Sequence, residues 1–145
     1  MKHSKGFTMI ELIVTLVVLG ILVAIAIPTY NGLMPRYRLN GATRQVATDL
    51  MKARMQAVKL STNVNVTFNS TTDSYTISNT SSGGSYSETF NIKTHYSGVE
   101  LASSGNPVFH PRGTLTNAST VTVTLTNSSG TKQIEVNIAG RVKQL

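Results

Sequence analysis

Residues 5–28, KGFTMIELIVTLVVLGILVAIAIP, are the stretch that decides the fold of this chain. A short basic leader, MKHSKG, precedes a long apolar run that Glu11 interrupts near its start. At about 1.5 Å per helical residue, residues 7–27 measure roughly 31 Å, the thickness of a bilayer's hydrocarbon core. A carboxylate is costly in such a segment and therefore marks a candidate functional site. The stretch predicts a membrane-inserted helix with one functional charge near its start.

A secretory signal peptide and a plain membrane anchor are two alternatives for this stretch. The basic start, the apolar run and Ala24-Ile25-Ala26 superficially fit a signal peptide. The run is longer than a usual signal-peptide core, however, and Glu11 interrupts it. A plain anchor with its basic end in the cytoplasm agrees with the positive-inside rule but has no need of Glu11. Both alternatives leave the acid unexplained.

The segment Lys5-Gly6-Phe7-Thr8-Met9-Ile10-Glu11-Leu12 resembles the processing site of type IV prepilins. That site joins a basic residue, a glycine and a phenylalanine to an acid five residues into the mature chain. The resemblance implies that prepilin peptidase removes residues 1–6 by cutting between Gly6 and Phe7 on the cytoplasmic side. It further implies that the new amino group of Phe7 is N-methylated, and that Glu11 pairs with this amine on a neighbouring subunit during assembly.

The physics of the charge at Glu11 agrees with this resemblance. Buried charges are tolerated when they are paired, and a single buried polar residue can set the axial register of packed helices. The alternative is that Glu11 lies at the membrane interface and reaches water. Gly20 and Pro28 fall where helices of this family carry weakening residues, because glycine costs about 1 kcal/mol in a helix and proline removes a hydrogen bond.

The rest of the chain divides by composition at about residue 61. Residues 28–60 continue the helix, with an apolar face at three- and four-residue spacing made of Ala42, Val46, Leu50, Ala53, Ala57 and Leu60. Asn31-Gly32 and Asn40-Gly41 are points where this helix could bend or break. Residues 61–145 are rich in Ser, Thr and Asn, and their apolar residues alternate in short runs: 64–68, 75–77, 90–92, 121–125 and 134–138.

Such alternation predicts half-buried antiparallel strands, and residues 127–130, NSSG, predict a hairpin between the last two. The expected fold class is therefore α+β. A long N-terminal helix, transmembrane in its first half, packs on an antiparallel β-sheet domain, as in type IV pilins.

The C-terminal third adds a second resemblance. Phe109-His110-Pro111-Arg112-Gly113, then the predicted hairpin, then Ala139-Gly140-Arg141-Val142 is similar to the GspH/FimT branch of minor pilins and pseudopilins. Pro111 and Gly113 suit a tight turn in which glycine takes a positive φ, and Gly140 suits a bulge or a strand end. This resemblance implies a type II secretion protein H-like subunit or a minor pilin.

The basic residues near the C-terminus suggest an alternative function. The chain has a formal net charge of +7, and 11 basic against 5 acidic residues follow from Pro28 onward. Some FimT-type minor pilins are linked to DNA capture through a basic C-terminal motif, which here is Gly140-Arg141-Val142-Lys143. By that resemblance Arg141 and Lys143 are candidate DNA-binding residues, with Arg112 and Lys132 as helpers. The opposing interpretation is a charged strand edge that prevents unwanted pairing.

Composition argues against an enzyme or a metal protein. The chain contains no cysteine, its three histidines share no close spacing, and Asp49 and Asp73 are isolated in the sequence. We therefore expect no catalytic residue, metal site or cofactor. The expected function is a structural subunit of a type II secretion pseudopilus or a type IV pilus, in its tip or priming complex. The expected location is the bacterial inner membrane, single-pass, with a periplasmic β-rich domain, and the expected partners are prepilin peptidase, other pilins and inner-membrane lipid, with DNA under the alternative.

Overall fold

The computed structural model describes residues 6–81, 84–116 and 119–145. Its first element is the helix α1, Met9–Leu60, which runs without a break through Gly20, Pro28 and both Asn-Gly pairs. The chain forms two compact units, Met1–Met34 and Pro35–Leu145. We call these the N-terminal unit and the C-terminal unit. The second half of α1 thus belongs to the same unit as the strands.

The N-terminal unit begins with a helix cap. Gly6, Phe7 and Thr8 precede the helix, which starts at Met9 and not at Phe7. The Oγ1 atom of Thr8 accepts a hydrogen bond from the backbone N–H of Glu11 at 3.3 Å, as an N-cap residue does. Met9–Ile27 is long and apolar enough to cross a membrane, and none of it is buried within the chain.

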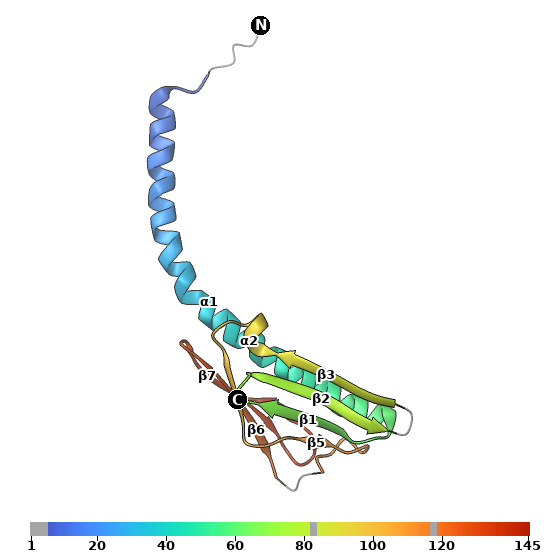
Figure 1. Ribbon diagram of the computed structural model, residues 1–145. Helices are drawn as coiled ribbons and strands as arrows, with labels where there is room; N and C mark the ends of the chain where they lie inside the picture. The colour runs from blue at the N-terminus through green and yellow to red at the C-terminus, as the bar shows by residue number, and fades with distance from the viewer. Residues whose placement is uncertain (1–5, 82–83, 117–118) are drawn as a thin grey trace. The chain divides into compact units, whose positions relative to one another are not determined.

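The C-terminal unit holds two four-stranded antiparallel sheets beside the helix (Figure 1). The first sheet has the order β3-β2-β1-β5, and the second has the order β4-β6-β7-β8. The strands of the first sheet are β1 Val64–Asn69, β2 Ser74–Ser81, β3 Gly84–Asn91 and β5 Val108–Phe109. Those of the second are β4 Glu100–Ser103, β6 Val121–Asn127, β7 Gly130–Val136 and β8 Val142–Gln144.

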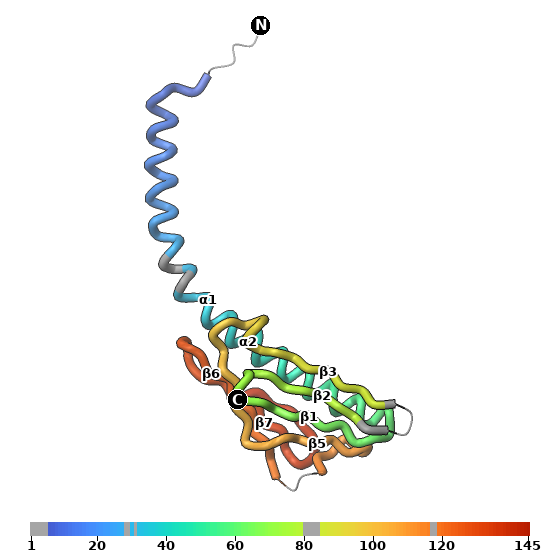
Figure 2. Tube along the Cα trace, viewed as in Figure 1, coloured from blue at the N-terminus to red at the C-terminus, as the bar shows by residue number. Residues whose placement is uncertain are grey.

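The predicted hairpin at residues 127–130 is confirmed. Strands β6 and β7 pair from Val121↔Val136 to Asn127↔Gly130, so the turn is as tight as the sequence indicates. Figure 2 traces the two strands of this hairpin. The Nδ2 atom of Asn127, at its turn, donates a hydrogen bond to the carbonyl oxygen of Pro35 in α1 at 2.7 Å. The hairpin tip is therefore fixed to the start of the C-terminal unit.

The core lies between the helix and the sheets. The helix contributes a stripe of small and medium residues, and the strands contribute their inward-facing alternate residues. Five of the six residues predicted for the apolar helix face are buried: Ala42, Val46, Leu50, Ala53 and Ala57. Leu60 is exposed, which corrects the prediction; it is the last residue of the helix and is followed by Ser61 at a positive φ.

Two predicted strand boundaries were wrong. Ile92 does not extend a strand but opens the one-turn helix α2, Ile92–His95, for which the side chain of Asn91 accepts a hydrogen bond from Thr94 N. Ile138 lies beyond the end of β7 and is exposed. In both cases a nearby cap or turn ends the ladder before the alternating pattern does.

Candidate functional site

The N-terminal site residues Gly6, Phe7 and Glu11 are exposed. Phe7 is 79% exposed, and Glu11 lies in the first turn of α1, where a negative charge suits the helix dipole. Glu11 forms no ion pair with any residue that the structure describes. Lys5 and the rest of residues 1–5 lie outside the described residues. The structure thus presents Gly6, Phe7 and Glu11 together at one end of an unburied apolar helix.

Gly20 lies within this apolar helix and has no heavy atom within 4 Å of where a Cβ would stand, apart from its own helix. Pro28 lies within α1 as well. A helix-weakening role for these two residues stays a prediction, because the helix is intact at both.

The C-terminal unit contains a buried polar contact that the sequence did not reveal. Asp49, on the buried face of α1, accepts hydrogen bonds at Oδ2 from the hydroxyl of Tyr75 and from Gln45 Nε2. Its Oδ1 atom accepts no hydrogen bond but lies 3.1 Å from the Nζ atom of Lys52. Burial, together with the hydrogen bond to Asp49, raises the pKa of the Tyr75 hydroxyl well above its ordinary value. Asp49 therefore joins the helix to strand β2.

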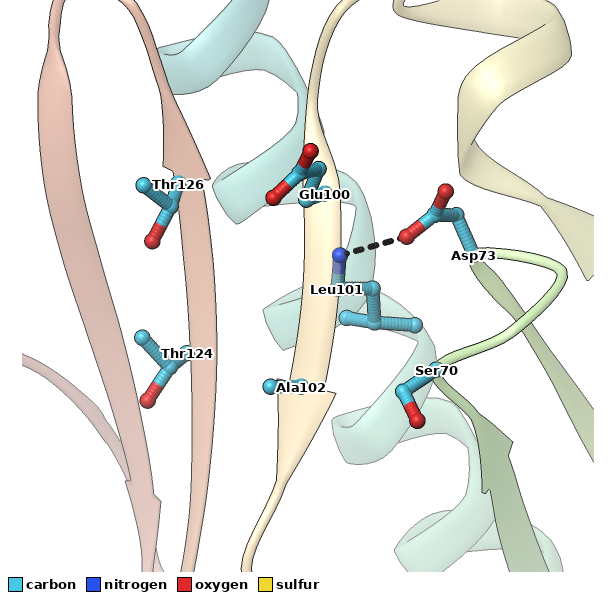
Figure 3. Close-up of a pocket in the computed structure, with 7 residues that line it drawn as sticks. All are labelled: Ser70, Asp73, Glu100, Leu101, Ala102, Thr124 and Thr126. Atoms are coloured by element: carbon cyan, nitrogen blue, oxygen red, sulfur yellow. Dashed lines mark hydrogen bonds between the residues drawn. The ribbon is translucent and has the colours of Figure 1, made fainter.

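Asp73 is a second carboxylate that the sequence showed as isolated and the structure shows as engaged. Its Oδ1 atom accepts a hydrogen bond from Leu101 N at 2.9 Å, and its Oδ2 atom lies 3.5 Å from Lys93 Nζ. Figure 3 shows the carboxylate of Asp73 directed at the backbone of Leu101. Asp73 lines a hollow of about 300 Å³. The other residues that line it are Ser70, Glu100, Leu101, Ala102, Thr124 and Thr126. Asp73 uses both oxygens to hold β4 and α2 in place.

The two glycines of the C-terminal motif meet in space. Gly113 ends a tight turn in which its N–H donates to the carbonyl oxygen of His110 at 2.7 Å, and Gly140 follows β7. Both have a positive φ, +78° and +73°. A Cβ at Gly140 would stand 1.9 Å from the carbonyl oxygen of Gly113, so a side chain cannot fit. The same oxygen accepts a hydrogen bond from Arg54 Nε at 2.8 Å. We call these three residues the Arg54 junction.

The candidate DNA-binding residues are divided between three places. Arg112 and Arg141 both flank the Arg54 junction, where they line two adjoining hollows floored by Met51, Met55 and Val58. Lys143 lies on the edge strand β8, directly opposite Glu135. Lys132 lies in β7 and lines a different hollow together with Arg36. The structure therefore brings together two of the four residues and adds Arg54, which sequence reasoning missed.

Comparison with known proteins finds matches to both the N-terminal segment and the C-terminal unit. The family described as "Type II transport protein GspH" matches residues 42–140, and the prokaryotic N-terminal methylation motif matches residues 1–27. A fimbrial protein of Pseudomonas aeruginosa is 45% identical over 47 residues, 32% of this chain and 30% of its own length. The chain thus spans less than a third of the curated relative that it matches.

Two solved structures share the fold. The type IV minor pilin FimU of Pseudomonas aeruginosa superposes with a TM-score of 0.63 at 16% identity, covering 76% of this chain and 90% of that one. The minor pseudopilin EpsH of the Vibrio cholerae type 2 secretion system gives a TM-score of 0.61 at 13% identity, covering 74% and 96%. With its pilin-like fold and its N-terminal methylation motif, the chain belongs to the family of the type II transport protein GspH.

Proposed function

We propose that this chain is inserted in the bacterial inner membrane through residues 7–27, is cut between Gly6 and Phe7, and then joins a type II secretion pseudopilus or a type IV pilus. The observation that supports this most strongly is the contrast in burial. The C-terminal unit completes a core of its own, whereas Met9–Ile27 is apolar and wholly unburied. Such a helix needs a bilayer before assembly and the helices of other subunits afterwards.

Glu11 is the assembly contact in this proposal. After cleavage, Phe7 would carry a free, N-methylated amine close to the start of the helix. A carboxylate that enters a bundle of apolar helices must find a positive partner, and the amine of a neighbouring subunit is one of the right charge. The pairing would set how far one subunit lies along the axis relative to the next. The subunit would act at the filament tip or in the priming complex.

The Glu11→Ala variant tests the docking contact. We expect the variant to be cut normally at Gly6 but to be lost from isolated filaments, because its helix offers no partner for the neighbouring amine. Val14→Ala is the matched control, since Val14 is an exposed residue of the same span with no charge. Filament incorporation of Glu11→Ala equal to that of the control would refute the contact.

The Gly6→Ala variant tests processing itself. We expect the purified variant to retain residues 1–6, because a Cβ at this position obstructs the peptidase. The intact mass of the chain measures this. Gly20→Ala is the control: it makes the same change away from the cleavage site, and the space around the Cβ is open at both positions. A normally shortened Gly6→Ala chain, with Phe7 at its N-terminus, would overturn the prepilin interpretation.

The orientation of the C-terminal unit is also a proposal, and the chain is well suited to test it. Because the sequence contains no cysteine, Ser128→Cys at the exposed hairpin turn provides a single thiol. A membrane-impermeant maleimide added to spheroplasts should label it if the C-terminal unit lies in the periplasm. Labelling only after the membrane is opened would place the unit in the cytoplasm instead.

DNA binding is a second candidate function, favoured by one observation: Arg54, Arg112 and Arg141 line adjoining hollows. No carboxylate lines either hollow among the described residues. Lys59 lines one of the hollows as well, so three exposed cations besides the engaged Arg54 would give weak binding whose affinity falls with salt, with a logarithmic slope of about −3. We expect Arg112→Gln with Arg141→Gln to remove binding of the full chain to duplex DNA, and Lys132→Gln with Lys143→Gln to reduce it less. Equal losses of DNA affinity for the two pairs of substitutions would refute a DNA-binding site at these two hollows.

A further inference from the structure

The hollow between the start of the C-terminal unit and the β6–β7 hairpin is lined by two cations, of which only Lys132 was considered above, as a helper in DNA binding. We call it the hairpin cradle. Its charged groups are Arg36 on α1 and Lys132 on β7, and its floor is the buried side chain of Leu39. Its remaining lining residues are Asn40, Ser129, Gly130 and Thr131. Every polar side chain in the cradle can donate a hydrogen bond, and none is a carboxylate.

The hairpin cradle is rigidly built. The side chain of Asn127 donates to the carbonyl oxygen of Pro35 at 2.7 Å and accepts from Ser129 N at 2.8 Å, so one amide ties the turn to the helix and shapes the turn itself. The side chains of Arg36 and Lys132 form no ion pair or hydrogen bond with any described residue. Two cations therefore face one hollow with their donors unused by the protein, which favours an anionic occupant.

The part of α1 that lines the cradle has no acidic residue nearby that is free to enter it. Between Glu11 and Asp49 the chain contains no acidic residue but three arginines, Arg36, Arg38 and Arg44. Asp49 itself is buried and engaged with Tyr75. The occupant of the cradle must therefore come from outside this part of the chain.

The short connection between the apolar span and Arg36 favours lipid headgroups as the source of the anion. Arg36 lies nine positions after Ile27, the end of the apolar span. Even a fully extended chain of that length reaches only about 31 Å, so an inserted span keeps the cradle close to the lipid headgroups in any arrangement of the two units. Such a tether raises the effective concentration of headgroups at the cradle. Tyr37, beside Arg36, is exposed and is a residue type enriched at membrane interfaces.

We propose that the hairpin cradle binds the phosphate of an anionic phospholipid headgroup, which docks the C-terminal unit on the membrane before the subunit leaves for the filament. The proposal rests on the membrane insertion proposed above. Arg36 and Lys132 would each contact the phosphate from opposite elements, and the hydroxyls of Ser129 and Thr131 would supply neutral donors. Docking would hold the unit at the surface where subunits are collected, and extraction of the span would break it.

The test uses the full chain carrying Ser128→Cys as its single thiol, labelled with a fluorophore and inserted into nanodiscs. One set of nanodiscs contains phosphatidylcholine alone, and the other also contains phosphatidylglycerol; both carry a headgroup-attached quencher. We expect the ratio of docked to undocked label to be about thirtyfold higher with the anionic lipid, at about fivefold for each of two cations near the surface. Arg36→Gln with Lys132→Gln should abolish this difference.

Two variants control for charge and for folding. Lys59→Gln with Lys143→Gln removes the same charge outside the cradle and should keep the difference between the two lipids. Arg36→Lys with Lys132→Arg keeps both charges in place and should keep it as well. Equal quenching in both lipids, or an effect of the Lys59 and Lys143 pair as large as that of the cradle pair, would overturn the proposal.

Other occupants give different results. Loss of quenching on addition of low concentrations of inorganic phosphate at constant ionic strength would show that the cradle binds free phosphate. Quenching that depends on the number of chains per disc would show that a neighbouring subunit occupies the cradle. Either result would overturn lipid docking. Cleavage at Gly6 and entry into filaments are measured separately on the same variants, so failure of docking is distinguishable from failure of assembly.

Discussion

The two halves of α1 belong to one continuous helix but meet opposite environments. Along Met9–Ile27 every large apolar side chain is exposed, whereas from Leu39 to Ala57 a stripe of small residues is buried against the sheets. Most helical stability in proteins comes from tertiary packing, and the second half has such packing within the chain. The first half has none, so the bilayer or other subunits must supply it. A helix can thus be continuous in backbone and divided in what stabilises it.

The substitution Gly140→Ala should show the largest effect on the C-terminal unit. Its Cβ would meet the carbonyl oxygen of Gly113 at a positive φ, so we expect a loss of about 4 kcal/mol in the free energy of unfolding. Urea denaturation of the full chain in detergent, followed by near-ultraviolet circular dichroism, measures it. Gly105→Ala is the control, because its nearest neighbour is Val121 Cγ2 at 4.0 Å. A cost for Gly140→Ala no larger than that control would contradict the Arg54 junction.

Removal of the buried carboxylate of Asp49 should have the next largest effect on the stability of the C-terminal unit. In Asp49→Ala the hydroxyl of Tyr75 and the amide of Gln45 lose their acceptor inside the core, which costs about 3 kcal/mol. Asp49→Ala with Tyr75→Phe removes the unsatisfied hydroxyl as well, and we expect it to recover part of that loss. If the double variant were destabilised by the full sum of the two single changes, the two side chains would not be coupled.

The comparison between the helix halves is sharpest when the same substitution is made in each. Val46→Ala removes a fully buried side chain and should cost about 2 kcal/mol of C-terminal unit stability. Val17→Ala removes an exposed one in the N-terminal unit and should leave the unfolding midpoint of the C-terminal unit unchanged. A similar loss of stability in both variants would mean that the two halves of α1 unfold together.

The pH dependence of Tyr75 gives the smallest effect. Its pKa is raised in the folded protein above that of the unfolded chain, so the stability it contributes is complete below about pH 10. Above that pH the unfolded chain releases the proton while the folded protein keeps it, and stability should fall by about 1.4 kcal/mol per pH unit. Urea midpoints between neutral and alkaline pH should decline less steeply for Tyr75→Phe than for Tyr96→Phe, whose hydroxyl is not in the Asp49 contact.

Residues with strong local patterns were predictable from the sequence, and contacts between distant residues were not. The turn at residues 127–130 and the alternation in β1 and β6 are local signals, and both are confirmed. Strands β4 and β5 were missed because Glu100–Ser103 buries Leu101 alone and Val108–Phe109 has only two residues. Short strands of this kind form because the neighbouring strand is already in place, not because of their own pattern.

In the candidate site as well, single residues were predictable from local patterns but their contacts were not. Gly113 and Gly140 were each recognised as turn or strand-end glycines, yet nothing local indicates that they touch. Arg54 borders the buried helix stripe, but its acceptor is 59 residues further along the chain. Asp49 and Asp73 looked isolated because their partners Tyr75 and Leu101 are likewise distant. Long-range pairing of this kind becomes visible only once the topology is known.

The Arg54 junction has a consequence for the order of events during folding. Gly140 lies far from Arg54 in the sequence, with both sheets' first strands between them. Contacts with such separation form late, because the intervening chain must be ordered first. The helix, the first sheet and the β6–β7 hairpin can therefore form before the junction does, and the contact of Gly140 with Arg54 and Gly113 closes last among them.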